Sequence, residues 1–173
     1  MPKFAAFLRG INVGGNRQVK MDELKRIFES LGFTDVETYI QSGNVIFESG
    51  DKGAGKIGKK IEKALAKALG FGVSVLVRGR GQLRKLLEHE PKLGKEEKSY
   101  VAFLSDGAGK KLKAGMESKD GIAVAKVLGD DAIVLCRPLM GKYAFPNAFL
   151  EKLTGQPATT RNWNTVMKMT GMD

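Results

Sequence analysis

The sequence predicts an α+β protein made of a ferredoxin-like β-α-β-β-α-β lobe, a second α+β lobe packed against it and a short C-terminal helix. Three features of the first 80 residues predict the ferredoxin-like order: two amphipathic helical segments, a turn-forming tripeptide between two strand-like segments, and strands at either end. We expect residues 1–80 and 81–173 to form the two lobes of a single compact unit.

The first strand and helix lie in residues 3–32. "KFAAFLRG" is typical of a short strand and is followed by the glycine-rich segment "GINVGGN". In "MDELKRIFESLG" the apolar residues recur at helical spacing and form one stripe, Leu24, Ile27, Phe28 and Leu31. Gly32 suits the C-terminal cap of this helix.

A β-hairpin, a second helix and a fourth strand complete the first lobe. "VETYIQSGNVIFES" predicts two strands joined at Ser42-Gly43-Asn44. Residues 56–69 form the clearest amphipathic pattern, and "GVSVLVRG" predicts the last strand. Alternation predicts that the helices cover one face of this sheet, through Phe4, Ala6, Leu8, Val73, Val75 and Val77. The opposite face, with Phe7, Tyr39, Ile46 and Leu76, then needs another cover.

The second half repeats part of this order. After a polar helix near residues 81–91, it predicts a strand at 99–105, a weak helix at 107–116, a hairpin turning at 129–131 and a helix at 145–155. A final helix is expected from about Arg161 to Thr170, with Thr159 or Thr160 as its N-cap. The β-α-β-β-α order echoes the first half without a residue-level repeat.

The net charge indicates which ligands to expect, and the hydropathy indicates the cellular compartment. The formal net charge is +10, and such a surface attracts phosphorylated ligands and nucleic acid. The apolar run at the N-terminus spans only residues 4–8, and no segment approaches the length of a membrane span. The single cysteine, Cys136, cannot form an internal disulfide. We therefore expect a cytoplasmic protein that does not enter a membrane.

The glycine-rich segment is the first candidate site. Gly10, Gly14 and Gly15 allow a tight loop with exposed backbone N–H groups. The side chains of Arg9, Asn12, Asn16 and Arg17 add hydrogen-bond donors around it. Such a loop suits a phosphate or a carboxylate. The alternative is a β-to-α connection whose glycines serve only its geometry.

Other chemistry has weak support. The segment from Gly53 to Lys60 matches the start of a P-loop, but Lys60 stands where Ser or Thr should hold magnesium. The glycine-rich segment lacks the dinucleotide-binding spacing. His89 is the only histidine, and adjacent Asp130 and Asp131 would point apart. The sequence therefore indicates no metal and no cofactor, and leaves open whether the protein is an enzyme.

The C-terminal string "TTRNWNT" is the second candidate site. With Thr160 as the cap, Arg161 and Asn162 would occupy the first turn of a helix, whose positive end favours an anion. The alternative is a capped helix that docks through Trp163, the only tryptophan. Both interpretations stay open at this point.

Three blocks of the sequence, "LRGINVGGNRQVKMDELKRIFESLGF", "VETYIQSGNVIF" and "ATTRNWNTVMK", carry a family resemblance. The chain resembles the uncharacterised bacterial proteins grouped as domain of unknown function 1697. The resemblance implies a small cytosolic α+β protein with a ferredoxin-like portion, and it brings no activity, substrate or catalytic residue. The blocks also contain Tyr39, Gln41, Ser42, Gly43 and Thr160.

Our functional hypothesis is that a phosphorylated small molecule or nucleotide binds in a cleft between the glycine-rich loop and the C-terminal helix. The predicted ligand-binding residues are Arg9, Gly10, Asn12, Gly14, Gly15, Asn16, Asn44, Arg161, Asn162 and Asn164. The alternatives are a nucleic-acid-binding protein that uses its basic surface and the lysines of residues 56–67, and an enzyme acting on an anionic metabolite.

Overall fold

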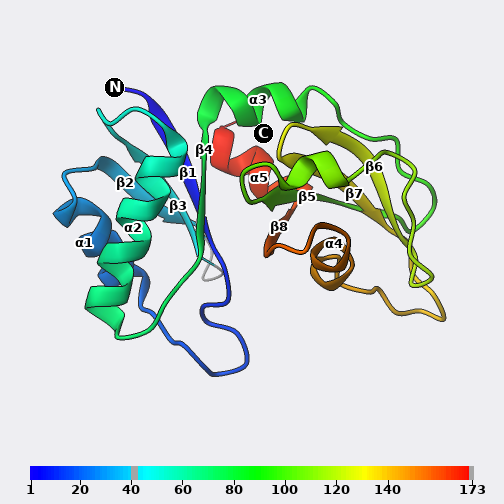
Figure 1. Cartoon of the computed structure of the whole chain (residues 1–173), viewed down its shortest axis with the longest axis horizontal. Helices are drawn as coiled ribbons and strands as arrows, with labels where there is room; N and C mark the ends of the chain where they lie inside the picture. Colours follow the sequence, from blue (N-terminus) through cyan, green and yellow to red (C-terminus); the bar gives the residue numbers. More distant parts are fainter. Residues whose placement is uncertain (40–42, 172–173) are drawn as a thin grey trace. The chain divides into compact units, whose positions relative to one another are not determined.

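The computed structural model describes residues 1–39 and 43–171 of the chain. It divides into two compact units, the N-terminal unit Met1–Arg84 and the C-terminal unit Lys85–Asp173 (Figure 1). Each unit is described by itself below.

The N-terminal unit has the predicted ferredoxin-like order. Its elements are β1 (Lys3–Leu8), α1 (Met21–Ser30), β2 (Thr34–Tyr39), β3 (Asn44–Glu48), α2 (Ala54–Leu69) and β4 (Val75–Gly79). The strands form one antiparallel sheet in the order β2-β3-β1-β4. Two crossovers over one face place the first and last strands side by side, as this fold class requires.

The core of this unit lies between the sheet and its two helices. The six strand residues predicted to meet the helices all belong to this core, together with Leu24, Ile27 and Phe28 of α1. Phe47 of β3 stacks on Phe33 with ring centroids 4.6 Å apart and meets Phe28 edge-on at 5.4 Å. Aromatic pairs of this geometry add to the hydrophobic gain of burial. The predicted division of the sheet into two faces is confirmed.

Helix α2 also settles the P-loop question. Gly58 and Lys59 lie inside α2, so the segment does not form a phosphate-binding loop. A Cβ at Gly58 would lie 3.4 Å from the Val75 carbonyl oxygen, so glycine allows the helix to pack closely on β4. The helix ends at Gly70, whose left-handed φ of 80° lets its N–H bond to the Ala66 carbonyl.

The C-terminal unit repeats the strand order of the N-terminal unit. It contains β5 (Lys98–Leu104), η1 (Ala108–Lys111), β6 (Ile122–Leu128), β7 (Asp131–Cys136), α4 (Asn147–Thr154), β8 (Ala158–Asn162) and α5 (Trp163–Thr170). The antiparallel sheet runs β6-β7-β5-β8, which matches β2-β3-β1-β4 position by position. Helix α3 (Arg80–Leu87) spans the boundary between the units. The echo seen in the sequence is therefore a second ferredoxin-like sheet.

The weak helix predicted at residues 107–116 is only the single 3-10 turn η1. Its backbone approaches the β6–β7 turn too closely for a longer helix of ordinary side chains. A Cβ at Gly109 would collide with the Gly129 carbonyl. Asp130 accepts hydrogen bonds from the N–H groups of Gly107 and Gly109 at 3.0 and 2.9 Å. Both N–H groups lie at the start of η1, so Asp130 caps it, and the extended backbone of Leu112 ends it after one turn.

The predicted start of the last helix is wrong. Thr159, Thr160 and Arg161 belong to β8, which pairs with β5, and α5 begins at Trp163. β-branched threonines suit a strand, and here the backbone finds its partners in β5. Thr160 lies within β8, two residues before the cap position of α5, and its hydroxyl donates to Asn147 Oδ1 at 2.9 Å. The cap is Asn162, whose Oδ1 accepts from the Thr165 N–H at 3.3 Å.

Two layers of side chains cover this second sheet. On one face, α4 and the segment around η1 pack on a core that includes Ala102, Leu104, Val134 and Leu150. On the other face lie buried Val101, Phe103 and Ile133. Helix α5 contacts β5 and β8, and its Trp163, Val166 and Met169 are buried.

Candidate functional site

The glycine-rich loop is a closed turn. The Asn16 N–H donates to the Val13 carbonyl at 3.2 Å, and the two residues between them, Gly14 and Gly15, both have positive φ values of 62° and 78°. Two successive positive φ angles define a type I′ turn, which glycine adopts without strain. Gly14 and Gly15 are therefore required by the geometry of the loop.

Asn12 holds the base of this loop together. Its side-chain Nδ2 donates to the Val19 carbonyl at 3.1 Å, and its Oδ1 accepts from the Val19 N–H at 2.8 Å. Its own N–H donates to the Arg17 carbonyl at 3.1 Å. The backbone N–H groups of Asn12 and Asn16 thus bond within the loop, and the side chain of Asn12 has a structural role there. Gly10, with φ 73°, allows the chain to leave β1 and enter the loop.

Two arginines line a hollow beside the loop. Arg9, Arg17, Glu62 and residues 72–74 enclose about 210 Å³ within the N-terminal unit. Nη1 of Arg17 donates to the Gly72 carbonyl at 3.3 Å, and the guanidinium lies 5.4 Å from the Phe71 ring centroid. The backbone N–H of Arg9 donates to the Ser74 carbonyl at 3.0 Å. The two sides of the hollow are therefore joined by hydrogen bonds.

The charge of this hollow favours an anion. Its lining residues include two arginines and one glutamate, Glu62, so the lining carries one net positive charge. A guanidinium binds phosphate and carboxylate oxygens through charge-assisted hydrogen bonds. A neighbouring hollow of about 410 Å³ also includes Asn12, but its charged residues, Lys20 and Glu23, balance each other.

The second sequence block holds the β2–β3 hairpin on the sheet. Asn44 is buried and donates from Nδ2 to the Tyr39 carbonyl at 2.9 Å. The Leu8 N–H donates to the Gly43 carbonyl at 2.8 Å, and a Cβ at Gly43 would lie 2.8 Å from Leu8 Cβ. Through these contacts, residues of the second block stabilise the sheet. Gln41 and Ser42 lie outside the described residues.

Arg161 and Asn162 are on opposite faces of β8. They pair with Val101 and Tyr100, which are consecutive residues of β5, and successive side chains of a strand alternate between faces. Arg161 is half-buried, its Nη1 donates to the Thr160 carbonyl at 2.9 Å, and burial lowers its pKa to about 10. The expectation that both residues occupy the first turn of a helix is wrong.

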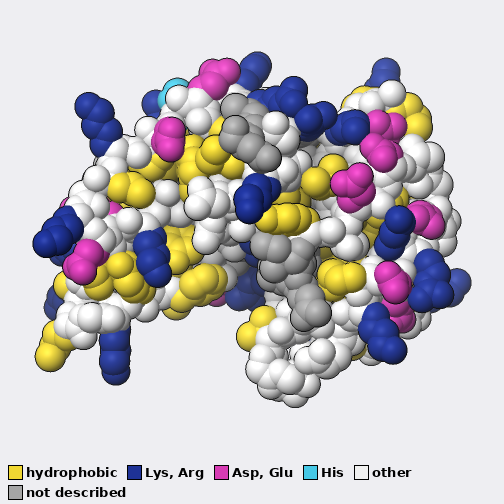
Figure 2. Space-filling model, turned by 180° about the vertical axis from the view of Figure 1, so that it is seen from behind, with side chains coloured by type: hydrophobic (Ala, Val, Ile, Leu, Met, Phe, Trp, Pro, Cys, Tyr) yellow, Lys and Arg dark blue, Asp and Glu magenta, His cyan; other side chains and the backbone are white. Residues whose placement is uncertain are grey.

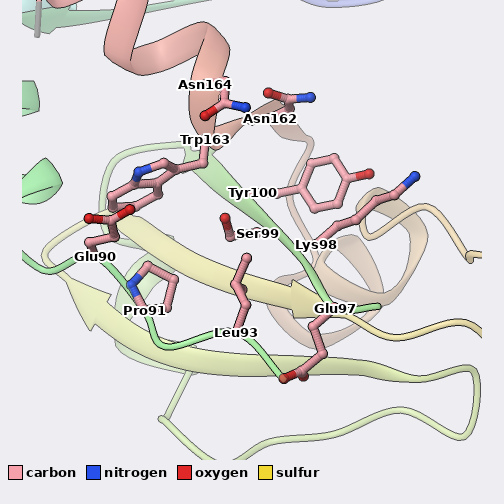
Figure 3. A pocket seen from close by; sticks show the side chains of 10 residues that line it. All are labelled: Glu90, Pro91, Leu93, Glu97, Lys98, Ser99, Tyr100, Asn162, Trp163 and Asn164. Atoms are coloured by element: carbon pink, nitrogen blue, oxygen red, sulfur yellow. The ribbon is translucent and has the colours of Figure 1, made fainter. Parts of the chain in front are cut away.

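Asn162 and Asn164 instead line a pocket of the C-terminal unit with Trp163 (Figure 3). The pocket encloses about 370 Å³ between residues 90–93, the start of β5 at 97–100, and residues 162–164. Figure 3 shows Glu90 and Pro91 beside the Trp163 indole at one end, and Tyr100 and Lys98 at the other.

The charged side chains of this pocket have ordered surroundings. The Lys98 Nζ lies 4.0 Å from the Tyr143 ring centroid, and the Tyr143 hydroxyl donates to the Glu96 carbonyl at 2.6 Å. Glu97 Oε1 accepts from the Gly94 N–H at 2.6 Å. Burial, followed by the influence of Cys136 and Tyr143, raises the pKa of Tyr100, which is therefore a neutral phenol at physiological pH.

Among the residues that the structure describes, we identify no catalytic group. Cys136 is buried, and burial raises its pKa to about 11, so its thiol is unreactive near neutral pH. Asp130 caps η1, and His89 lies exposed after the end of α3. Within residues 1–39 and 43–171 there is no group of three or more side chains that could hold a metal ion. The same residues contain no helix long and apolar enough to cross a bilayer.

On the face seen in Figure 2 the basic side chains do not form a single block. Figure 2 shows Lys and Arg side chains spread over the visible face with Asp and Glu side chains among them. On α2, Lys60 pairs with Asp51 at 3.0 Å and lies 5.3 Å from the Phe33 ring centroid. Phe47, the one aromatic residue of β3, faces the helices and is buried, so the sheet does not offer it to a base.

The sequence-predicted residues thus separate by role. Arg9 lines the hollow of the N-terminal unit, and Asn162 and Asn164 line the pocket of the C-terminal unit. Convergence of the two segments on one ligand stays a prediction. Sequence reasoning missed Glu90, Lys98 and Tyr100, because they lie outside the three blocks. The pairing of β5 with β8 places Tyr100 opposite Asn162 and so brings the start of β5 into the pocket.

These features define an α+β protein with two ferredoxin-like sheets whose polar pockets lie at loops and strand ends. The chain belongs to the family described as protein of unknown function (DUF1697), whose model matches residues 1–129. It is similar to the conserved bacterial protein SP0830 from Streptococcus pneumoniae, with 27% identity, a TM-score of 0.71, and coverage of 99% of this chain and 98% of that chain. No curated protein matches it. The family resemblance seen in the sequence is confirmed, and it assigns no function.

Proposed function

We propose that this protein binds a phosphorylated small molecule, nucleotides included, and that the phosphate occupies the hollow between Arg9 and Arg17. One observation carries the proposal: both arginines line the same hollow of about 210 Å³, opposed by a single carboxylate. A nucleotide or a sugar phosphate presents the dianion that such a pair of guanidinium groups binds best.

Arg17 is held in place before a ligand arrives. Its hydrogen bond to the Gly72 carbonyl and its position over Phe71 restrict the side chain. A restricted side chain loses less conformational entropy on binding, so more of the interaction energy appears as affinity. The other N–H groups of its guanidinium serve as donors to a phosphate oxygen.

The volume of the hollow limits what it holds. About 210 Å³ accommodates a phosphate group and part of a sugar, whereas pockets for whole drug-sized ligands enclose about 300 to 1,000 Å³. The hollow therefore recognises the phosphate, and the remainder of the ligand extends beyond it. Inorganic phosphate, ribose 5-phosphate and AMP should all compete for it.

The test is calorimetric titration with inorganic phosphate, AMP and a single-stranded oligonucleotide, on the wild type and on Arg9→Gln and Arg17→Gln. Hydrogen bonds to charged groups are worth about 1.5–3 kcal/mol, so either substitution should weaken phosphate and AMP binding by about tenfold or more. Glu62→Gln is the matched control, because removing the opposing carboxylate should strengthen binding of the same ligands.

Unchanged phosphate affinity in both arginine variants would overturn the proposal. Non-specific nucleic-acid binding predicts a different pattern, in which the oligonucleotide binds, affinity falls steeply with salt, and AMP does not saturate. An enzyme acting on an anionic metabolite would also need an acid or base, and the hollow offers only Glu62 for that role.

A further inference from the structure

We propose that the pocket of the C-terminal unit binds a zwitterionic small molecule, with its ammonium group at the Glu90 and Trp163 end and its carboxylate group at the Lys98 end. This site lies within residues 90–164 and does not depend on the phosphate site proposed above. Its ligand differs in chemistry from a phosphorylated one, because the lining holds two carboxylates, Glu90 and Glu97, as well as the Lys98 ammonium.

The acidic end consists of a carboxylate beside an aromatic ring. In Figure 3 the Glu90 carboxylate lies beside the Trp163 indole. The pocket contains a second carboxylate, Glu97, but its Oε1 already accepts a hydrogen bond from the Gly94 N–H at 2.6 Å. Glu90 is the carboxylate that lies beside the aromatic ring, and the indole of tryptophan adds the strongest cation–π attraction of any side chain.

The aromatic wall is rigid. Trp163 is only 5% exposed, and it begins α5, which packs against β5 and β8. The small part of the side chain that is exposed is thus fixed, and it meets a ligand without first losing rotational freedom. The position of Trp163 at the edge of this pocket therefore has a use beyond its contribution to the core.

The basic end pairs an ammonium with an amide at a helix terminus. Lys98 is oriented by the Tyr143 ring at 4.0 Å, and Asn162 caps α5 through its Oδ1. That leaves the Asn162 NH₂ group as a donor to a carboxylate. These donors all favour an anionic group, whereas Glu90 at the opposite end repels one.

The volume agrees with a small metabolite. About 370 Å³ is near the lower end of the usual range of ligand pockets, which is about 300 to 1,000 Å³. A molecule the size of an amino acid fits, with its two charged groups separated along the pocket. Ser99, which lies between the two ends in Figure 3, adds a hydroxyl that can donate or accept.

The fluorescence of Trp163 reports on this pocket directly, since it is the only tryptophan in the chain. The protein is titrated with four linear five-carbon molecules that differ in their terminal groups: δ-aminovalerate, cadaverine, glutarate and the pentanediol with terminal hydroxyls. We expect δ-aminovalerate to bind most tightly, by about tenfold over the diol, because only it satisfies both ends. Equal affinities, or tightest binding of glutarate, would overturn the proposal.

Substitutions then assign the two ends. Glu90→Gln should weaken δ-aminovalerate and cadaverine by about tenfold and leave glutarate no weaker, whereas Lys98→Gln should weaken δ-aminovalerate and glutarate and spare cadaverine. Glu88→Gln and Lys92→Gln are matched controls, because both residues are exposed and neither lines the pocket. If Glu90→Gln, with an unchanged melting temperature, binds δ-aminovalerate as the wild type does, the assignment is wrong.

The two proposed sites can fail separately. Arg17→Gln should bind δ-aminovalerate with unchanged affinity, and Glu90→Gln should bind phosphate with unchanged affinity. If AMP quenches the fluorescence of Trp163 and competes with δ-aminovalerate, the zwitterion proposal is wrong. This holds whatever the outcome of the experiments on Arg9 and Arg17.

Discussion

The two units share a strand order but differ in their first crossover. In the N-terminal unit α1 has ten residues and buries Leu24, Ile27 and Phe28. In the C-terminal unit the corresponding connection contains only η1, four residues long. The same sheet forms in both cases, so its strand order does not depend on a long helix in the first crossover. Strand pairing and the second crossover, α2 or α4, are the features that the units share.

The two units also share an irregularity in strand pairing. The second strand of each unit shifts register against the third, between Thr34 and Glu37 in β2 and between Val124 and Lys126 in β6. Bulges of this kind bend an edge strand and increase its twist. The shared bulge indicates that the architecture repeats even though the residues do not.

The pockets of the two units are lined by different residues. The N-terminal unit presents two arginines and one glutamate, and the C-terminal unit presents an aromatic pocket with acidic and basic ends. Under the two proposals above, two units of one topology bind ligands of different chemistry, in line with the general rule that loops on a stable scaffold carry function.

The largest expected effect tests the difference between the crossovers. Phe28→Ala should destabilise the protein by about 3–5 kcal/mol, because it empties a site between two aromatic rings. Leu112→Ala, in the first crossover of the C-terminal unit, removes a smaller buried side chain and should cost about 2–3 kcal/mol. Urea unfolding of both variants measures this. Equal losses would mean that η1 and its flanks stabilise their unit as strongly as α1 does.

The close approach of η1 to the β6–β7 turn gives the next prediction. Gly109→Ala should cost about 1–3 kcal/mol, since the added methyl group collides with the Gly129 carbonyl. Gly81→Ala is the matched control, because its added Cβ meets no atom within 4 Å and lies in α3. In a helix, alanine is favoured over glycine by up to about 1 kcal/mol. A Gly109→Ala variant as stable as the wild type would show that this contact can relax without cost.

Removing the N-cap of α5 should lower the free energy of unfolding by less than the substitutions above. Asn162→Ala should destabilise the protein by about 1 kcal/mol, since it leaves the Thr165 N–H without the Asn162 oxygen. Asn164→Ala is the control, because Asn164 is exposed and does not cap the helix. Thermal unfolding of the two variants distinguishes them. If only Asn164→Ala is destabilising, the assignment of the cap is wrong.

The smallest effect concerns alkaline pH. The pKa of Cys136 is raised from 9.0 to about 11 by burial, so the folded protein holds the thiol proton more tightly than the unfolded chain does. The corresponding stability is fully present below pH 9.0 and is lost as the pH rises towards about 11. Urea midpoints across this range should fall more steeply for the wild type than for Cys136→Ala. Parallel curves would contradict a buried protonated thiol.

The fold of the N-terminal unit could be predicted because its signals are local. The stripe of α1 and the alternation of β1 are readable from neighbouring residues, and both are confirmed. The strand β8 was missed because its signal is not local: Thr160 is a strand residue only by pairing with Ala102 of β5. A polar string before a helix resembles a cap until that pairing is known.

The residues of the candidate sites could likewise be predicted only in part. The sequence blocks led to Arg9, Asn162 and Asn164, because arginines and asparagines near glycines or a helix end indicate binding. They also led to Asn12 and Asn44, whose amides bond to backbone carbonyls and support the structure. The same residue types supply hydrogen-bond donors to ligands and to the backbone of a loop. The two roles can be distinguished only when the hydrogen-bond partners are known from the structure.

One measurement tests the central claim that the two units bind ligands of different charge. Amide and indole N–H resonances of the labelled protein are followed by NMR during titration with inorganic phosphate, and separately with δ-aminovalerate. We predict that phosphate shifts the resonances of Arg9, Arg17 and Ser74, and that δ-aminovalerate shifts the Trp163 indole. Phosphate shifts centred on Trp163, or one set of resonances shifted by both ligands, would contradict the account.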